Sequence, residues 1–398
     1  MIYNSTAMIS NPELGYYSCN NLFFDSKIEA CIYGTAQKMP VNWHFNEEVF
    51  GSYNWQVEPE LTLDNFYNQR ARQIREQYDY VILSFSGGAD SNNILESFLR
   101  QGLFVDEILV NTMDVRDQLT VANPNEKSVW NAGAEYKLQT VPRLQYIKDK
   151  SPNTKINVID MSKHIFDSLE TAGDASWILS KKEMLNVSAS TRYNYVHFKE
   201  VRNQFDKDKK IALIVGVDKP KGIIIKGEFR ILFNDRAANI VSAQEHLNEY
   251  PNATVKNFYW TPESVPMLIK QGHVLKNWLE AFPQYIPLWT LTDNDTYANN
   301  FRLMHERMLR TIIYTTWNQN WYQADKSVLD WFNEFDHWFV TKYNNTRAFS
   351  IWKSGMQHVL NNASDYMVYK NGKPHGLKGF HHSYALGKMK VTQDQLIK

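Results

Sequence analysis

The residues best suited to chemistry in this sequence form a short polar turn, Ser86–Ser91, which reads SGGADS. Two adjacent glycines let the backbone turn sharply and leave its N–H groups uncovered. A helix starting here would direct further unpaired N–H groups and the positive end of its dipole to the same place. Ser86 and Ser91 add hydroxyl donors, and Asp90 suits a Mg²⁺ ligand or a helix N-cap. The turn therefore predicts a phosphate-binding loop.

The flanking residues predict the strand and helix that such a loop needs. Tyr80–Phe85 is an apolar run typical of a buried strand, and Ile94, Leu95, Phe98 and Leu99 have the spacing of one helix face. A plain Gly-Gly turn between strand and helix is the alternative. The stretch is not a Walker loop, since no Gly-Lys-Ser/Thr follows, and it lacks the third glycine of the dinucleotide fingerprint.

At all six positions SGGADS resembles the SGGxDS loop of the PP-loop ATP pyrophosphatases. This superfamily includes asparagine synthetase, NAD and GMP synthetases, tRNA lysidine synthetase and the sulfonucleotide reductases. The resemblance implies ATP and Mg²⁺ as cofactors, with cleavage to AMP and pyrophosphate. A compatible order of strands and helices runs from about Asp79 to Val217. The whole chain also resembles uncharacterised PP-loop proteins of large tailed phages, which implies modified nucleotides, tRNA or DNA as substrates.

Further predicted strands end where a parallel sheet would place its site. Asp106–Thr112 is one and Lys155–Asp160 another, and the most apolar, Ile211–Val217, should lie inside the sheet. The resemblance implies that the end of the second strand frames adenine, although ordinary loop residues fit equally well. The implied nucleotide-binding residues are Ser84, Ser86, Gly87, Gly88, Ala89, Asp90, Ser91, Asn111, Thr112, Gly216, Asp218 and Lys219.

The turn after Ile211–Val217 resembles, more weakly, a strand-end motif that superfamily members place beside the α-phosphate. Lys219 would stabilise charge on the departing pyrophosphate, and Asp218 would share Mg²⁺ with Asp90. Arg192, at the head of a predicted helix, is a second candidate cation. The catalytic candidates are thus Lys219, Asp90 and Arg192, and the metal candidates are Asp90 and Asp218. A solvated turn before Pro220 is the alternative for Asp218 and Lys219.

The rest of the chain suggests three regions. Residues 1–77 form a mixed region that contains a predicted helix, Leu63–Gln77, and residues 78–235 form an α/β nucleotide-binding domain with helices on both faces of a mostly parallel sheet. Gly222–Phe233 predicts a hairpin turning near Lys226-Gly227. Residues 236–398 are expected to be mainly helical, with a helix starting at Thr261-Pro262-Glu263, a Trp-rich helical core over 297–367, and a basic tail or lid over 370–398. Lys270 and His273 are acceptor-site candidates, with a buried core role as the alternative for His273.

Composition limits the classes of partner. The 398 residues carry 43 Lys plus Arg and 43 Asp plus Glu, so net charge gives no general attraction to nucleic acid or membrane. Cys19 and Cys31 are the two cysteines, which supports neither a disulfide framework nor a zinc site. Without an apolar span or signal pattern, we expect a cytoplasmic protein with no membrane partner. Its partners would be ATP and an unidentified acceptor; nucleic acid and a second copy of the chain stay open.

These observations predict an AMP-forming ligase or transferase. ATP would adenylate a substrate oxygen, and an amine or ammonia would then displace AMP. Glutamine-dependent relatives use a cysteine directly after the initiator Met, where this chain has Ile2, so we expect no glutamine hydrolysis by that route. The alternatives are sulfur transfer, as in sulfonucleotide reductases or thiolases, which needs a reactive cysteine, and nucleotide binding without catalysis.

Overall fold

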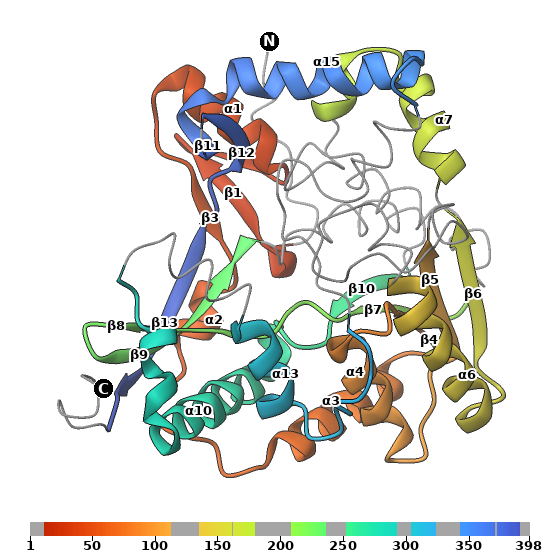
Figure 1. Ribbon diagram of the computed structural model, residues 1–398, viewed down its shortest axis with the longest axis vertical. Helices are drawn as coiled ribbons and strands as arrows, with labels where there is room; N and C mark the ends of the chain where they lie inside the picture. The colour runs from red at the N-terminus through yellow and green to blue at the C-terminus, as the bar shows by residue number, and fades with distance from the viewer. Residues whose placement is uncertain are drawn as a thin grey trace.

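The computed structural model (Figure 1) describes residues 12–112, 135–160, 162–179, 208–235, 252–292, 304–323, 343–370 and 372–390. Among these residues, five parallel strands form a central sheet in the order β10 (Ala253–Asn257), β7 (Ile211–Val215), β4 (Tyr80–Ser84), β5 (Glu107–Thr112) and β6 (Lys155–Asp160). Along the chain, β5 and β6 are added in turn on one side of β4, and β7 and β10 are then added in turn on its other side. This is a doubly wound order, and its switch point lies between β4 and β7. The prediction of an α/β fold with a parallel sheet is therefore confirmed.

The predicted strands of this sheet are confirmed apart from small differences at their ends. β6 has its predicted bounds, while β4 stops one residue earlier and β7 stops at Val215, fully buried and inside the sheet as expected. β10 was not predicted. β10 lies at the edge of the sheet, and its residues alternate between buried and half-exposed because one of its faces is less covered than the other, so it lacks the continuous apolar run that marks the interior strands.

Helices pack beside this sheet and carry its loops. α3 (Leu63–Gln77) has the predicted bounds: Thr62 caps it by accepting from the Asn65 N–H at 3.2 Å, and its apolar face is buried. α4 (Ala89–Leu99) contacts α3, and α6 (Val141–Lys150) lies near β4 and β6 (Figure 1). A π-helical turn, Glu135–Thr140, leads into α6.

A second, antiparallel sheet contains the predicted hairpin. β8 (Lys221–Ile225) and β9 (Glu228–Asn234) are joined through Lys226 and Gly227, both with positive φ, at 52° and 77°. Such a turn matches the twist of a hairpin. The third strand, β13 (His381–Lys388), comes from the C-terminal part of the chain and runs alongside β9 (Figure 1).

The expected helical C-terminal region is not supported. After α15 (Arg347–Asn362) the chain forms β11 (Met367–Lys370), β12 (Lys373–Leu377) and β13, so the described part of the expected basic tail is strand. The pairing of β13 with β9 is a tertiary interaction, and local composition does not encode it. Within the expected helical stretch 297–367, α13 (Glu306–Ile313) and α15 are helices, but residues 314–323, which follow α13, are turns and irregular chain.

The N-terminal region forms a small sheet, in the order β2 (Leu22–Phe24), β1 (Tyr16–Cys19) and β3 (Asn42–His44), with helices α1 (Lys27–Gln37) and α2 (Glu47–Gly51). Its aromatic side chains share one core with β9 and with the loop after β10, where Phe45, Phe233 and Trp260 pack together. Residues 12–77 are thus held to the rest of the described chain by a common core.

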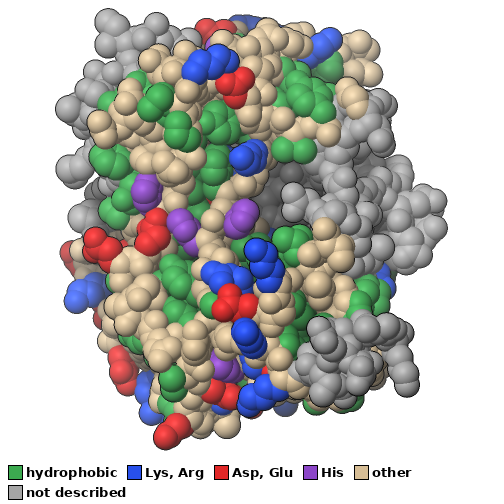
Figure 2. Space-filling model, turned by 90° about the vertical axis from the view of Figure 1, so that its left-hand side faces the viewer, with side chains coloured by type: hydrophobic (Ala, Val, Ile, Leu, Met, Phe, Trp, Pro, Cys, Tyr) green, Lys and Arg blue, Asp and Glu red, His purple; other side chains and the backbone are tan. Residues whose placement is uncertain are grey.

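The surface carries charges of both signs. Figure 2 shows Lys, Arg, Asp and Glu interspersed on one face, with histidines gathered near its middle. Among the described residues, no three His, Cys, Asp or Glu side chains lie together as metal ligands would. None of the helices in the described ranges is long and apolar enough to span a bilayer.

Candidate functional site

The predicted loop joins β4 to α4. Gly87 has φ +73°, and Gly88, which has no side chain of its own to cap the helix, is the N-cap residue of α4. Ser91 Oγ and Asn92 Nδ2 both donate to the Gly88 carbonyl, at 3.2 and 2.8 Å. The loop carbonyls are thus satisfied by side chains of α4. Asp90 lies inside the first turn of α4, so its alternative role as N-cap is wrong.

The segment before α6 supports the loop from the other side. The Ser86 carbonyl accepts from Thr140 Oγ1 at 2.8 Å and from Gln139 Nε2 at 3.0 Å. A Cβ atom at Gly87 would lie 3.0 Å from the Thr140 Cα and 3.1 Å from the Gln139 carbonyl oxygen. Only glycine combines the positive φ with this close approach.

Lys219 meets Asp90 at the centre of the site. Lys219 Nζ lies 2.6 Å from Asp90 Oδ2, and the Lys219 side chain is 8% exposed. The two loops come this close because Gly216, the first residue after β7, packs against the start of α4: a Cβ there would lie 3.4 Å from the Asp90 Cβ and 3.6 Å from the Ser91 nitrogen. The structure therefore brings together the predicted residues of the two loops, and Lys219 is not a solvated turn residue.

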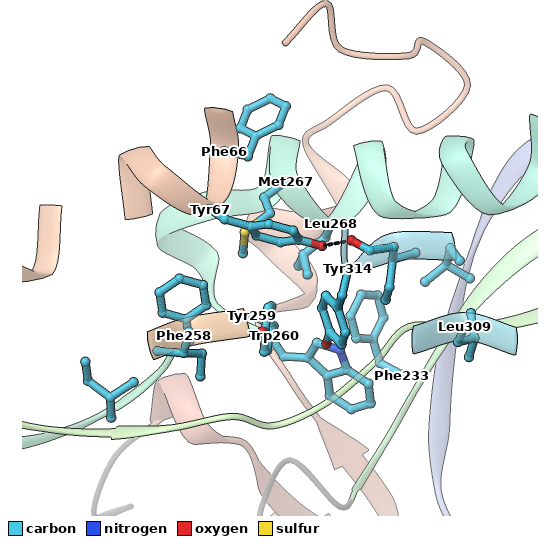
Figure 3. Packing of buried hydrophobic residues seen from close by; sticks show 14 of the residues in the cluster. Phe66, Tyr67, Phe233, Phe258, Tyr259, Trp260, Met267, Leu268, Leu309 and Tyr314 are labelled. Atoms are coloured by element: carbon cyan, nitrogen blue, oxygen red, sulfur yellow. Dashed lines mark hydrogen bonds between the residues drawn. The ribbon is translucent and has the colours of Figure 1, made fainter. Parts of the chain in front are cut away.

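Two tyrosines complete the surroundings of Asp90. Tyr314 donates from its hydroxyl to Asp90 Oδ1 at 2.5 Å, and Tyr259 donates to the Asp90 carbonyl at 2.9 Å. Figure 3 shows Tyr67, Tyr259 and Tyr314 gathered from α3, the loop after β10 and the end of α13. Tyr67 holds the Tyr314 loop by donating to the Ile313 carbonyl at 3.0 Å (Figure 3). Both carboxylate oxygens of Asp90 thus accept hydrogen bonds from buried donors.

Asp90 and Lys219 each influence the pKa of the other. Burial raises the pKa of Asp90, and Lys219 opposes that shift. Burial alone would lower the pKa of Lys219, but Asp90, Glu306 and Asp218 together raise it above its usual value. Glu306 Oε2 on α13 lies 3.5 Å from Lys219 Nζ. Lys219 is therefore held as a buried cation between acidic groups from different elements.

Asp90 and Asp218 fit Mg²⁺ in their chemistry, because Mg²⁺ in nucleotide sites usually binds one or two carboxylates together with substrate phosphates. Asp218 Oδ1 accepts the Lys219 N–H at 2.6 Å. Asp90 shares its two oxygens with Lys219 and Tyr314. A metal ion at Asp90 would have to share one of these oxygens or displace its donor.

The other residues predicted for the site differ in where they lie relative to Asp90 and Lys219. Ser84 ends β4, and Asn111 and Thr112 end the adjacent strand β5. Arg192 and its predicted helix fall outside the described residues. Lys270 pairs with Glu58 at 2.7 Å, and His273 contacts the Trp55 carbonyl at 3.0 Å, so both side chains have partners in the N-terminal region.

Tyr259, Glu306 and Tyr314 were missed by sequence reasoning. They lie in loops and on a helix that are distant along the chain from SGGADS, and none belongs to a local motif. The one available signal was indirect: a carboxylate that lies largely inside the protein, as Asp90 does, requires hydrogen-bond donors for its oxygens.

Tyr314→Phe tests the contact with Asp90 through pH. A hydrogen bond to a charged group contributes about 1.5–3 kcal/mol and one to a neutral group about 1 kcal/mol. Burial raises the pKa of Asp90, so the side chain is more fully ionised at pH 8 than at pH 4, and we expect the variant to lose about 2 kcal/mol of unfolding free energy at pH 8 and less, about 1 kcal/mol, at pH 4. Urea unfolding at both pH values measures this.

Tyr259→Phe is the matched control, since its hydroxyl donates to the Asp90 backbone instead. We expect its loss, about 1 kcal/mol, to be the same at both pH values. A pH-independent loss in Tyr314→Phe would show that Tyr314 does not stabilise the ionised carboxylate.

Comparison with known proteins does not assign this chain to a family. No protein-family model matches the chain, and no curated protein sequence matches it. Any functional conclusion therefore rests on the geometry of the site.

Proposed function

We propose that this chain is an AMP-forming, ATP-dependent ligase or transferase. The observation that carries the proposal is the pairing of Asp90, from the SGGADS loop, with Lys219, from the turn after β7, at the switch point of a doubly wound sheet. Ligands of such sheets bind in the crevice outside the carboxyl ends of the strands at this point. The first turn of α4 adds the N–H groups and dipole that favour phosphate.

In the proposed reaction an acceptor oxygen attacks the α-phosphorus of ATP. The bond between that phosphorus and the oxygen bridging to the β-phosphate breaks, and pyrophosphate leaves with its electron pair. An amine or ammonia then attacks the adenylated acceptor and displaces AMP. The protein's contribution would be to position the reactants and to stabilise developing charge.

Each residue has a proposed role in that reaction. The loop Ser86–Ser91 would bind phosphate through its N–H groups and hydroxyls. Lys219 would stabilise charge on the leaving pyrophosphate, which its buried, protonated state favours. Asp90 and Asp218 would hold Mg²⁺, which when bound neutralises phosphate charge. Asn111 and Thr112 would lie beside the adenine.

The cysteines favour this proposal over sulfur transfer. Cys19 and Cys31 are buried, at 1% and 0% exposure, and burial raises the pKa of Cys31 to about 12. Sulfur transfer requires an accessible thiolate, which a buried thiol with a raised pKa does not provide. Nucleic acid as the acceptor, self-association and a cytoplasmic location remain predictions.

The products of ATP test the proposal. We expect ATP labelled at the α- and γ-phosphates, incubated with Mg²⁺, an ammonium salt and carboxylate, carbonyl or amide acceptors, to give labelled AMP and labelled pyrophosphate. Lys219→Met purified in parallel controls for contaminating enzymes. ADP and phosphate as the only products of the wild-type chain would contradict the proposal.

A further inference from the structure

Arg143 on α6 is a buried cation beside the loop. It is 3% exposed, and within the described part of the chain no Asp or Glu forms an ion pair with it. Its Nε is buried without a hydrogen-bond partner. Burial lowers the pKa of Arg143 to about 10, which leaves it protonated at neutral pH. A buried charge of this kind is unfavourable unless a ligand or a π-system compensates it.

Arg143 lies directly against the glycine turn. A Cβ atom at Gly87 would lie 3.3 Å from the Arg143 Cδ. Nη1 donates to the Gln139 carbonyl at 2.7 Å, and the Gln139 side chain donates in turn to the Ser86 carbonyl at 3.0 Å. One short chain of contacts therefore fixes the guanidinium relative to the loop.

Residues 317–323, here called the covering segment, close over this place. The Arg143 guanidinium carbon lies 4.5 Å from the ring centre of Trp321 and 5.3 Å from that of Trp317. Arg143 Nη2 donates to the Tyr322 carbonyl at 3.3 Å. The next residue, Gln323, accepts the Ala89 N–H through Oε1 at 3.2 Å.

Tyr322 and Gln323, which are consecutive in the covering segment, thus accept hydrogen bonds from two donors: the Arg143 guanidinium and the first N–H of α4. Both acceptors are neutral oxygens, and both distances exceed the 2.7–2.9 Å or so typical of charged partners. A phosphate oxygen is a stronger acceptor for both donors. Phosphate oxygens bound by the same two donors would take the places of these two oxygens.

We propose that Arg143 binds the β- and γ-phosphates of the nucleotide, and that these phosphates displace Tyr322 and Gln323 from the loop. This inference rests on the proposed function and adds a phosphate-binding residue to it. A guanidinium stacks through its faces and binds phosphate through its edge, so Trp317 and Trp321 can keep their contacts while Tyr322 yields its place.

The test is equilibrium titration of the full chain with Mg²⁺-pyrophosphate and separately with AMP. We expect Arg143→Met to weaken pyrophosphate binding by at least about tenfold and to change AMP binding by less than about twofold. Arg143→Lys keeps the charge but loses the planar fork, so its loss should be smaller. Arg310→Met is the matched control: Arg310 also faces the Trp317 ring, at 5.9 Å, and its loss should leave pyrophosphate binding unchanged.

Gln323→Ala tests whether phosphate displaces the Gln323 side chain from the loop. It also provides a second test if Arg143→Met does not fold. Because pyrophosphate would no longer compete with the carboxamide for the Ala89 N–H, we expect binding about threefold tighter than in the wild type. Unchanged pyrophosphate binding in folded Arg143→Met, or unchanged or weaker binding in Gln323→Ala, would overturn the inference while leaving ATP binding intact. A wild-type chain that binds neither ATP nor pyrophosphate would instead overturn the proposed function.

Discussion

Lys219→Met should lower the rate of ATP cleavage by about 10²–10³-fold, the effect of removing one preorganised donor to developing charge. It should also destabilise the fold by about 3–5 kcal/mol, because it leaves Asp90 without its buried partner. Both effects are large because Lys219 Nζ is buried between Asp90 and Glu306. Urea unfolding and steady-state kinetics measure them separately.

A double variant separates the structural role of Lys219 from the chemical one. In Lys219→Met with Asp90→Asn both charges of the pair are gone, so much of the lost stability should return, with a coupling energy of about 1–3 kcal/mol. The rate of ATP cleavage should not return, because neither Met nor Asn can stabilise charge on pyrophosphate. Recovery of turnover in the double variant would show that Lys219 only neutralises Asp90 and takes no part in the chemistry.

Much of the central sheet was predictable from local patterns. β4, β5 and β7 are interior strands, and each reads as a mostly apolar run because both of its faces are covered. α3 could be predicted to the residue because a capping Thr62 precedes a regular apolar face. The loop itself was predictable because glycine and serine have conformational and hydrogen-bonding roles that few other residues can take.

The remainder depends on tertiary contacts. β13 contains polar residues and a glycine and becomes a strand because β9 offers an edge for it to pair with. Trp317 and Trp321 were predicted to form a helical core, but they stack on Arg143 outside any described helix. Tyr314 reaches Asp90 only because Tyr67 and α13 hold its loop in place. No window of sequence around these residues contains that information.

Gly87→Ala, which adds one methyl group, should disrupt the SGGADS loop strongly. An alanine at φ +73° costs about 1–2 kcal/mol in backbone strain, and its Cβ would meet Thr140 and the Gln139 carbonyl at 3.0–3.1 Å. Gly102 is a matched control, with φ +66° but nothing within 4 Å of its hypothetical Cβ. Gly102→Ala should therefore carry the backbone strain alone, without moving the segment that supports the loop.

Calorimetric titration of Mg²⁺-ATP into the wild type, Gly87→Ala and Gly102→Ala tests most directly whether the SGGADS loop binds nucleotide phosphate. We expect the wild type and Gly102→Ala to bind with the same affinity, and Gly87→Ala, at a temperature where it remains folded, to bind at least about tenfold more weakly. ATP binding of equal affinity in all three proteins would contradict the account, because the nucleotide would then be bound somewhere other than this loop.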